Sequence, residues 1–150
     1  MDTCKDCEYA RRDAHSRKAY LHSHEVPVAA FERVHMDHLQ LVKSGQYSYL
    51  LVLCDALTQY VELYPCVGCS AKEACEKLIG YISRLGCMRF LMSDRGPAFV
   101  GKVMTALTQL LGIKQLKTSS YHAQSNGRVE FCNSMILKML RVYCTDQTDW

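Results

Sequence analysis

Three acidic residues lie in segments that are otherwise rich in apolar residues. Asp37 lies in a strand-like segment, Asp94 follows the apolar run "CMRFLMS" and precedes a Gly-Pro turn, and Glu130 lies in a helical stretch near the C-terminus. An ionised carboxylate loses its hydration in an apolar setting, so each acid needs a metal ion or a hydrogen-bond cluster beside it. For Asp37 alone, the plain alternative is a strand-end acid bonded to backbone amides. The 35 residues between Asp94 and Glu130, with Asp37 upstream, are the most specific signal in the chain.

The chemistry that fits three carboxylates is metal-dependent phosphoryl transfer. Hard cations such as Mg²⁺ prefer oxygen ligands. Two such ions about 3.5–4 Å apart activate an attacking oxygen and stabilise the leaving oxygen. We therefore predict that Asp37, Asp94 and Glu130 are catalytic and bind two Mg²⁺ or Mn²⁺ ions, with Asp37 able to bridge them. Asp55, after the apolar run "YLLVLC", is the rival first ligand, and we interpret it as a turn-forming residue because Asp readily accepts hydrogen bonds from the amides that follow it.

Polar and basic residues gather around the acids and along the approach to the last helix. Basic groups neutralise phosphates and polar side chains position a strand, so the approach is predicted to contact DNA. The alternative is a surface loop with ordinary helix capping by Ser125 or Asn126. For Arg95, orienting a phosphate and pairing with an acid are both open. The predicted DNA-binding residues are Arg95, Lys117, Tyr121, His122, Gln124, Ser125, Asn126, Gly127, Arg128 and Asn133.

The elements that must position these residues are predicted by the hydrophobic periodicity. Three strands come first, followed by alternating helices and strands, in the order β-β-β-α-β-α-β-α. The strands are expected within 31–41, 47–57, 59–66, 87–94 and 113–119, and the helices within 71–86, 98–112 and 126–143. This order predicts an α/β fold with a mixed five-stranded sheet and helices on both faces. In such sheets ligands bind outside the carboxyl ends of strands, which is where Asp94 lies.

Details of the helices are also predicted. Ser70 is expected to cap the first helix, with Glu73 as its capping-box partner and Gly86 as the stop signal. Each later helix has one apolar stripe. The stripe of helix 98–112 comprises Phe99, Val103, Ala106 or Leu107, and Leu110. The stripe of helix 126–143 comprises Val129, Cys132, Ile136, Met139 or Leu140, and Tyr143.

Composition indicates one folded domain. The chain has 150 residues, of which 49% are apolar and 22% charged, and this length suits a single core. No apolar stretch approaches the roughly 20 residues that span a bilayer, so no membrane partner is expected. The N-terminus has no apolar signal region, which favours an intracellular protein, and the nine cysteines are interpreted as mostly reduced core thiols. Residues 81–150 carry nine basic and four acidic side chains, a modest footprint for a polyanion.

Taken together, these residues resemble the catalytic core of retroviral and LTR-retrotransposon integrases, most closely the gypsy type. The matching stretches are "CKDC", "FERVHMDHL", "YLLVLCDALTQYVELYP", "LMSDRGPAF" and "LGIKQLKTSSYHAQSNGRVEFCN". The resemblance implies a ribonuclease H-like fold and an Asp-Asp-35-Glu triad formed by Asp37, Asp94 and Glu130. It also implies processing of element ends, strand transfer of a DNA 3′-hydroxyl onto a target phosphodiester, homo-oligomers, and action in the nucleus.

The chain departs from the family pattern at two positions. Ala123 replaces a proline before the last helix, and Phe131 replaces an arginine after the predicted catalytic glutamate. The alternative function is therefore a domesticated or decayed core that binds DNA or protein without catalysis. A third possibility, another nuclease on the same fold, would use a different set of acids, such as Glu73 or Glu76.

The N-terminal "CKDC" is half of a zinc site. Zinc takes four ligands, and in the resembling family two histidines precede Cys4 and Cys7, so Zn²⁺ is expected only if that histidine half is present. Residues 1–26 are expected to be the remnant of this zinc-binding domain plus a linker, and residues 27–150 the catalytic core. We expect the chain to be a fragment or a domesticated copy of a longer polyprotein. The alternative ligands for Cys4 and Cys7 are His15, His22 and His24. The second CxxC, "CVGC" at 66–69, is interpreted as core thiols in a turn.

Overall fold

The computed structural model describes residues 27–117, 123–144 and 150, without the side chains of residues 123–130 and 143. The elements are β1 (Arg33–Ser44), β2 (Tyr47–Asp55), β3 (Val61–Cys66), α2 (Ala71–Leu85), β4 (Phe90–Ser93), α3 (Pro97–Val100), α4 (Lys102–Leu110), β5 (Lys114–Lys117) and α5 (Ala123–Tyr143). The predicted order of strands and helices is confirmed, except that two helices, α3 and α4, replace the single helix expected over 98–112. Among the described residues, no helix combines the length and apolar character needed to cross a bilayer.

The five strands form one mixed sheet in the order β3-β2-β1-β4-β5. The first three strands are antiparallel neighbours, and β4 and β5 extend the sheet in parallel with β1. The apolar run of β2 is buried from Leu50 to Asp55, as its lack of alternation predicts for a strand covered on both faces. The central strand β1 therefore has an antiparallel partner on one side and a parallel partner on the other.

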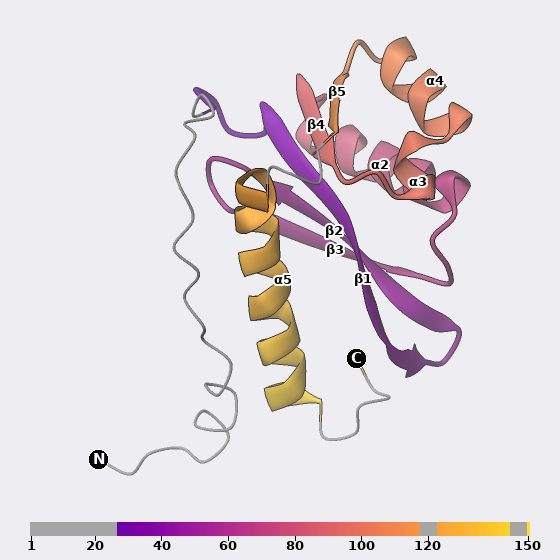
Figure 1. Ribbon diagram of the computed structural model, residues 1–150, viewed down its shortest axis with the longest axis vertical. Helices are drawn as coiled ribbons and strands as arrows, with labels where there is room; N and C mark the ends of the chain where they lie inside the picture. The colour runs from indigo at the N-terminus through magenta and orange to yellow at the C-terminus, as the bar shows by residue number, and fades with distance from the viewer. Residues whose placement is uncertain (1–26, 118–122, 145–149) are drawn as a thin grey trace.

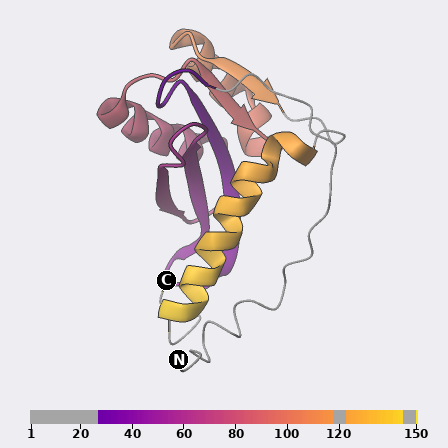
Figure 2. The same cartoon turned by 90° about the vertical axis from the view of Figure 1, so that its left-hand side faces the viewer.

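Helices cover both faces of the sheet, as Figures 1 and 2 show. The larger core lies between the sheet and the α2–α4 side, where Val34, Met36 and Leu78 belong to one buried cluster. The smaller core lies under α5, where Ile136 meets Leu50 and Val52. Because side chains alternate along a strand, Met36 faces the α2 side and its neighbour Asp37 faces the α5 side. The pattern of β1 thus sends its carboxylate toward the thinner core.

The ends of α2 follow the predicted signals with one difference. The Ser70 side chain accepts a hydrogen bond from the Glu73 amide, and Gly86 ends the helix at a φ of 88°, a conformation that favours glycine. The Glu73 carboxylate, however, accepts hydrogen bonds from the Val67 and Gly68 amides at 2.9 and 3.2 Å. Glu73 is therefore the predicted partner of Ser70 through its amide. Its carboxylate, however, binds the preceding loop and not the backbone amide of Ser70.

The apolar stripe predicted for helix 98–112 is confirmed at Phe99, which is buried, and at Leu107, which packs on the larger core, and it is wrong at Val103 and Leu110. The backbone of Gly101 is extended, with a ψ of 156°, so the helix breaks at this residue. The break shifts the phase of α4, so that Met104 and Thr108 are buried although neither was expected to be. Val103 and Leu110 are 56% and 84% exposed.

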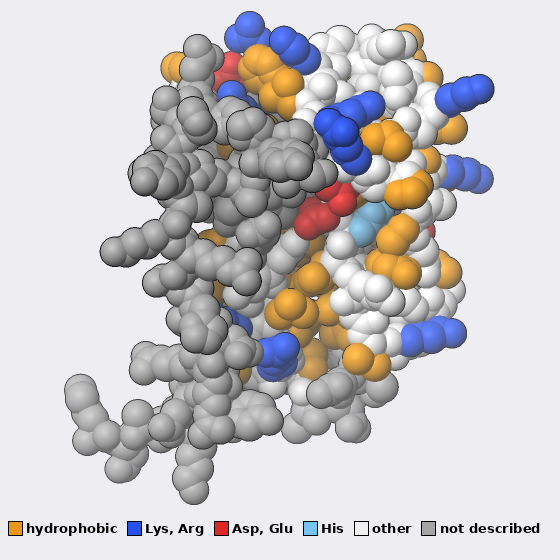
Figure 3. Space-filling view, in the orientation of Figure 1, with side chains coloured by type: hydrophobic (Ala, Val, Ile, Leu, Met, Phe, Trp, Pro, Cys, Tyr) orange, Lys and Arg blue, Asp and Glu red, His pale blue; other side chains and the backbone are white. Residues whose placement is uncertain are grey.

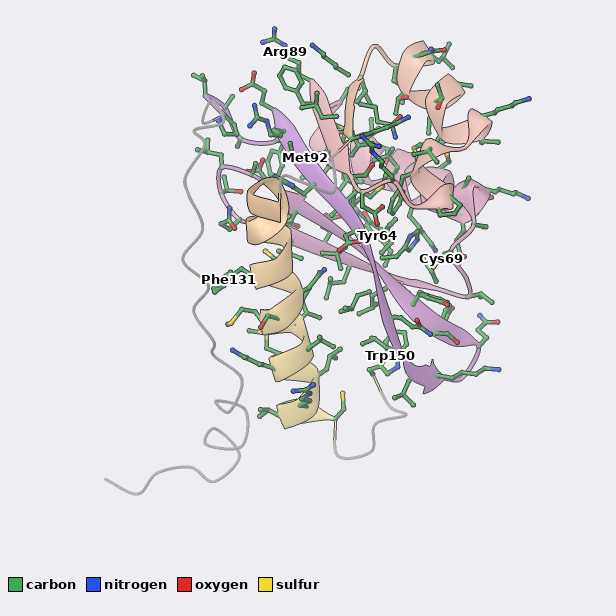
Figure 4. All side chains as sticks on the ribbon, in the orientation of Figure 1. Tyr64, Cys69, Arg89, Met92, Phe131 and Trp150 are labelled. Carbon is green, nitrogen blue, oxygen red and sulfur yellow. The ribbon has the colours of Figure 1, made fainter. Side chains whose placement is uncertain are left out.

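In α5 the predicted stripe is confirmed where side chains are described. Cys132 and Ile136 are buried and Leu140 packs on the cluster under the helix, while Met139 is exposed. Trp150 packs against the same cluster, and its indole nitrogen donates a hydrogen bond to the Val42 carbonyl of β1 (Figure 4). This face of the sheet is therefore covered by residues from the last part of the chain.

Candidate active site

Two of the three predicted catalytic acids lie in, or directly after, neighbouring strands. The parallel register of β1 and β4 pairs Met36 with Ser93, so Asp37 and Asp94 each follow that pair by one residue. Asp94 lies directly after the carboxyl end of β4, as predicted, while β1 continues past Asp37 to Ser44. Figure 3 shows acidic side chains together at the surface, beside a histidine and close to Lys or Arg side chains. The sheet register therefore brings together two carboxylates that are far apart in the sequence.

Asp37 is held by hydrogen bonds from two elements. Its Oδ1 accepts from the His38 amide at 2.8 Å, and its Oδ2 accepts from the Asn133 side-chain amide of α5, also at 2.8 Å. Asp37 is half-buried. The backbone bond expected under the plain alternative is present, but a carboxylate that only closed a strand would need no donor from a helix 96 residues away. The Asn133 contact fixes both the side-chain orientation of Asp37 and the placement of α5.

Asp94 is held by the turn that follows it. Its Oδ1 accepts a hydrogen bond from the Gly96 amide at 2.8 Å. A Cβ at position 96 would lie only 2.9 Å from the same oxygen, so the close approach requires glycine. Among the described residues, none donates a hydrogen bond to Asp94 Oδ2. The Gly-Pro turn therefore orients one carboxylate oxygen and leaves the other available.

The third acid lies on the helix that contacts Asp37. Glu130 is in α5, three residues before Asn133, and residues three apart lie on the same face of a helix. The backbone of Glu130 is therefore one turn from the Asn133–Asp37 bond. Its side chain lies outside the described part of the structure, and the described residues alone contain no group of three metal-binding side chains. The meeting of all three carboxylates stays a prediction.

Sequence reasoning missed His38, which follows Asp37 on β1. Its ring stacks on Phe99 of α3, with the centroids 4.8 Å apart and the planes 9° from parallel, and it meets Tyr49 edge-on at 6.5 Å. Burial lowers the pKa of His38, while the negative charges of Asp94 and Glu73 act in the opposite direction. Its Nε2 is buried and has no hydrogen-bond partner among the described residues. The available signal was the second histidine in "HMDHL", one residue after Asp37.

The reported sequence relatives of the chain are retroviral and retrotransposon polyproteins. No protein-family model matches the chain. The chain is 38% identical over 114 residues to the Gag-Pol polyprotein of woolly monkey sarcoma virus, which covers 73% of this chain and 7% of the polyprotein. It is 32% identical over 131 residues to the Pol polyprotein from transposon 412 of Drosophila melanogaster, which covers 84% of the chain and 10% of that protein. The chain thus spans a tenth or less of the length of these relatives.

Retroviral integrase structures are similar to the chain in fold. The HTLV-2 integrase catalytic core domain, in complex with magnesium, has a TM-score of 0.65 at 22% identity and covers 77% of this chain and 73% of that one. The resemblance to the integrase catalytic cores of Pol polyproteins is confirmed, in sequence by the retroviral and retrotransposon polyproteins and in fold by the solved integrase core. A chain of the simian T-cell lymphotropic virus intasome, in complex with PP2A regulatory subunit B56 gamma, has a TM-score of 0.70 at 20% identity and covers 94% of this chain and 50% of that chain. The expected ribonuclease H-like fold is confirmed.

The predicted DNA-binding residues divide into four groups. Arg95 and Lys117 are exposed, and Lys117 pairs in register with Ser93 beside Asp94. Asn133 is half-buried and donates to Asp37. Tyr121 and His122 lie outside the described residues. The remaining five, Gln124, Ser125, Asn126, Gly127 and Arg128, lie within α5, whose first residue is Ala123. The helix therefore begins three residues earlier than predicted, so that Gln124 and Ser125, which were expected to precede it, lie in its first turn.

Asp55, the rival candidate for the first metal ligand, is a structural residue. Asp55 is fully buried and accepts hydrogen bonds from the Phe31 amide, the Thr58 amide and the Thr58 hydroxyl, at 2.9, 2.8 and 2.6 Å. These donors confirm its interpretation as a turn-forming acid. They also hold Phe31 at a positive φ of 62°, which a residue with a side chain rarely adopts.

The two cysteines of the second CxxC motif differ in burial. Cys66 is buried and Cys69 is exposed, both are free thiols, and burial raises the pKa of each. The interpretation of "CVGC" as turn thiols is half correct, because Cys69 lies outside the core. Cys4, Cys7 and the histidines at 15, 22 and 24 lie outside the described residues, so the zinc half-site and the domain boundary at 26/27 stay predictions.

Proposed function

We propose that this chain is the catalytic core of an integrase that cleaves and joins DNA phosphodiesters with two divalent metal ions. The observation that carries the proposal is the β1–β4 register, which brings Asp37 and Asp94 side by side at the carboxyl end of β4. The Asn133 bond supports it, because it docks the helix that bears Glu130 onto Asp37. Asp37, Asp94 and Glu130 are the proposed catalytic residues and metal ligands.

The donor chemistry of the site fits Mg²⁺ or Mn²⁺. Asp37 and Asp94 offer carboxylate oxygens, which are hard ligands, and one oxygen of Asp94 has no internal donor among the described residues. The HTLV-2 integrase core of the same fold is a magnesium complex. When bound, such ions activate an attacking oxygen and stabilise a leaving one. Zn²⁺ is proposed only for Cys4 and Cys7, and only with a histidine half.

The chain's own residues orient the ligands and attract the substrate. Asn133 and the Gly96 amide fix the two aspartates in place before DNA arrives, which lowers the reorganisation needed for reaction. Arg95 and Lys117 are exposed next to Asp94 and provide positive charge for phosphates. The nucleophile is water or a DNA 3′-hydroxyl, so no covalent enzyme intermediate is needed. Element ends and target DNA are the proposed substrates, in a homo-oligomer that acts in the nucleus.

The test is nicking and strand transfer on DNA oligonucleotides with Mg²⁺ or Mn²⁺. Asp94→Asn keeps the size of the side chain but weakens metal binding, and is expected to lower the rate at least about 100-fold. Glu76→Gln is the matched control, because it removes one negative charge from an exposed position on α2. Equal activity of Asp94→Asn and the unmodified chain would remove the triad assignment.

The second candidate function is a non-catalytic module that binds DNA or protein. The observation that favours it is Phe131, which is 64% exposed and points away from the sheet (Figure 4). It follows the proposed catalytic glutamate directly, where the resembling family has a basic residue. Calorimetric titration with Mn²⁺ separates the candidates. Binding that is lost in Asp94→Asn supports the enzyme, and absence of binding in the unmodified chain supports the module.

A further inference from the structure

Two buried thiols meet between the sheet and α5. The Sγ atoms of Cys54, on β2, and Cys132, on α5, are 3.3 Å apart. Cys54 is 0% exposed and Cys132 is 7% exposed. The two residues are 78 positions apart in the chain, so no local constraint of the backbone brings them together. The contact is a product of the docking of α5 on the sheet.

The surroundings of the two thiols leave α5 freer to move than β2. Cys54 lies in a central strand and pairs with His35 on β1 and Val61 on β3, so its position is fixed by two neighbours. Cys132 lies on a helix held to the sheet by side chains. A disulfide has an S–S distance of about 2.05 Å, so the sulfurs must approach by about 1.2 Å. A small shift of α5 toward β2 provides this approach.

We propose that Cys54 and Cys132 form a reversible disulfide when the protein meets hydrogen peroxide. Peroxide oxidises the more exposed Cys132 thiol to a sulfenic acid, and the peroxide oxygen that is not transferred leaves as water. The Cys54 sulfur then attacks the Cys132 sulfur, the S–O bond breaks, and a second water leaves with the Cys54 proton. Two thiols are oxidised and one peroxide is reduced. Dithiothreitol reverses the change by thiol–disulfide exchange.

The bond would fasten the helix of the proposed active site to the sheet. Cys132 is adjacent to Asn133, which donates to Asp37, so the link lies beside the contact that docks α5. A bridge over this sequence separation restricts the unfolded chain and stabilises the fold. This inference goes beyond the proposed function and does not depend on catalysis, because its readouts are a covalent link and a melting temperature.

Other thiols must be distinguished from this pair. In the unfolded chain, trypsin gives peptide 129–138, which contains only Cys132, and peptide 44–72, which contains Cys54 together with Cys66 and Cys69. Cleavage after Glu62 separates Cys54 from the other two. Cys69 is exposed and supplies the control variant Cys69→Ala.

The experiment uses the full chain treated with hydrogen peroxide, then unfolded in N-ethylmaleimide and digested without reductant. The expected product is a Cys54–Cys132 peptide pair that dithiothreitol separates. The melting temperature of the oxidised protein is expected to rise by about 10 °C over that of the reduced protein. The rise is expected to disappear in Cys132→Ala and in Cys132→Ser and to persist in Cys69→Ala.

The proposal is overturned if Cys54 and Cys132 are both alkylated after peroxide treatment of folded protein. It is equally overturned if either thiol is recovered as a sulfinic acid or linked to a different cysteine. A rise in melting temperature that persists in both Cys132 variants also contradicts it. Loss of DNA cleavage in the untreated protein would count against the proposed function and leave this inference unaffected.

Discussion

Asp37 and Asp55 show at the residue scale how hydrogen-bond partners separate a site residue from a structural one. Both are acids in an apolar stretch of sequence. Asp55 is fully buried and accepts two hydrogen bonds from Thr58, in the turn that follows it, and one from the amide of Phe31, so its carboxylate holds the turn and Phe31 in place. Asp37 is half-buried and one of its partners comes from a helix distant in the sequence. The two carboxylates have the same capacity to accept hydrogen bonds, so the difference between them follows from where their donors lie.

The burial of His38 leads us to predict that the folded chain loses stability in acid. Burial lowers its pKa in the folded chain from an ordinary value of 6.5, despite the opposing charges of Asp94 and Glu73. The unfolded chain therefore binds the proton more readily, and the free energy of unfolding falls as the pH is lowered through about 6.5. His38→Phe keeps a ring to stack on Phe99 and cannot titrate, so the loss between pH 7.5 and 5.5 is expected to be smaller.

Urea unfolding of both proteins at these two pH values measures the effect. His38→Phe is also expected to be at least as stable as the unmodified chain at pH 7.5, because the buried Nε2 lacks a partner among the described residues. The same pH dependence in both proteins would contradict this role of His38.

At the scale of elements, two glycines make a matched pair. Gly96 lies in the turn after β4, where a Cβ would meet Asp94 Oδ1 at 2.9 Å, whereas Gly80 lies inside α2 with nothing within 4 Å of a Cβ. Gly96→Ala is expected to displace the Asp94 carboxylate and to lower DNA cleavage at least about tenfold. Gly80→Ala is expected to raise the free energy of unfolding by about 0.5–1 kcal/mol, because alanine favours a helix interior.

Cleavage assays and urea unfolding of the two variants measure both effects. Gly80→Ala is expected to keep the activity of the unmodified chain, so it controls for substitution of a glycine as such. Unchanged cleavage by Gly96→Ala would show that the turn does not orient Asp94 for reaction.

For the whole molecule, the two faces of the sheet differ in how much they bury. The α2 face contains a large cluster to which α2 contributes Ala74, Cys75, Leu78 and Tyr81, while among the described side chains α5 buries Cys132 and Ile136. Local opening requires less free energy where fewer apolar contacts are lost. We therefore expect the backbone amides of residues 131–143 in α5 to exchange hydrogen faster than those of α2.

Hydrogen exchange followed by mass spectrometry tests this order. Ile136→Ala removes a side chain of the smaller core and is expected to speed exchange in α5 more than in α2. Equal exchange in the two helices, in both proteins, would show that the molecule opens as a single unit.

The chain sequence by itself determined the order of the elements, the caps of α2 and the three candidate acids, because these depend on local periodicity, on turn residues and on spacing. Only the tertiary structure decided how strands far apart in the sequence pair. The β1–β4 register, the Asn133–Asp37 bond and the Cys54–Cys132 contact join segments by packing. Such contacts depend on three-dimensional distance, which no window of sequence contains.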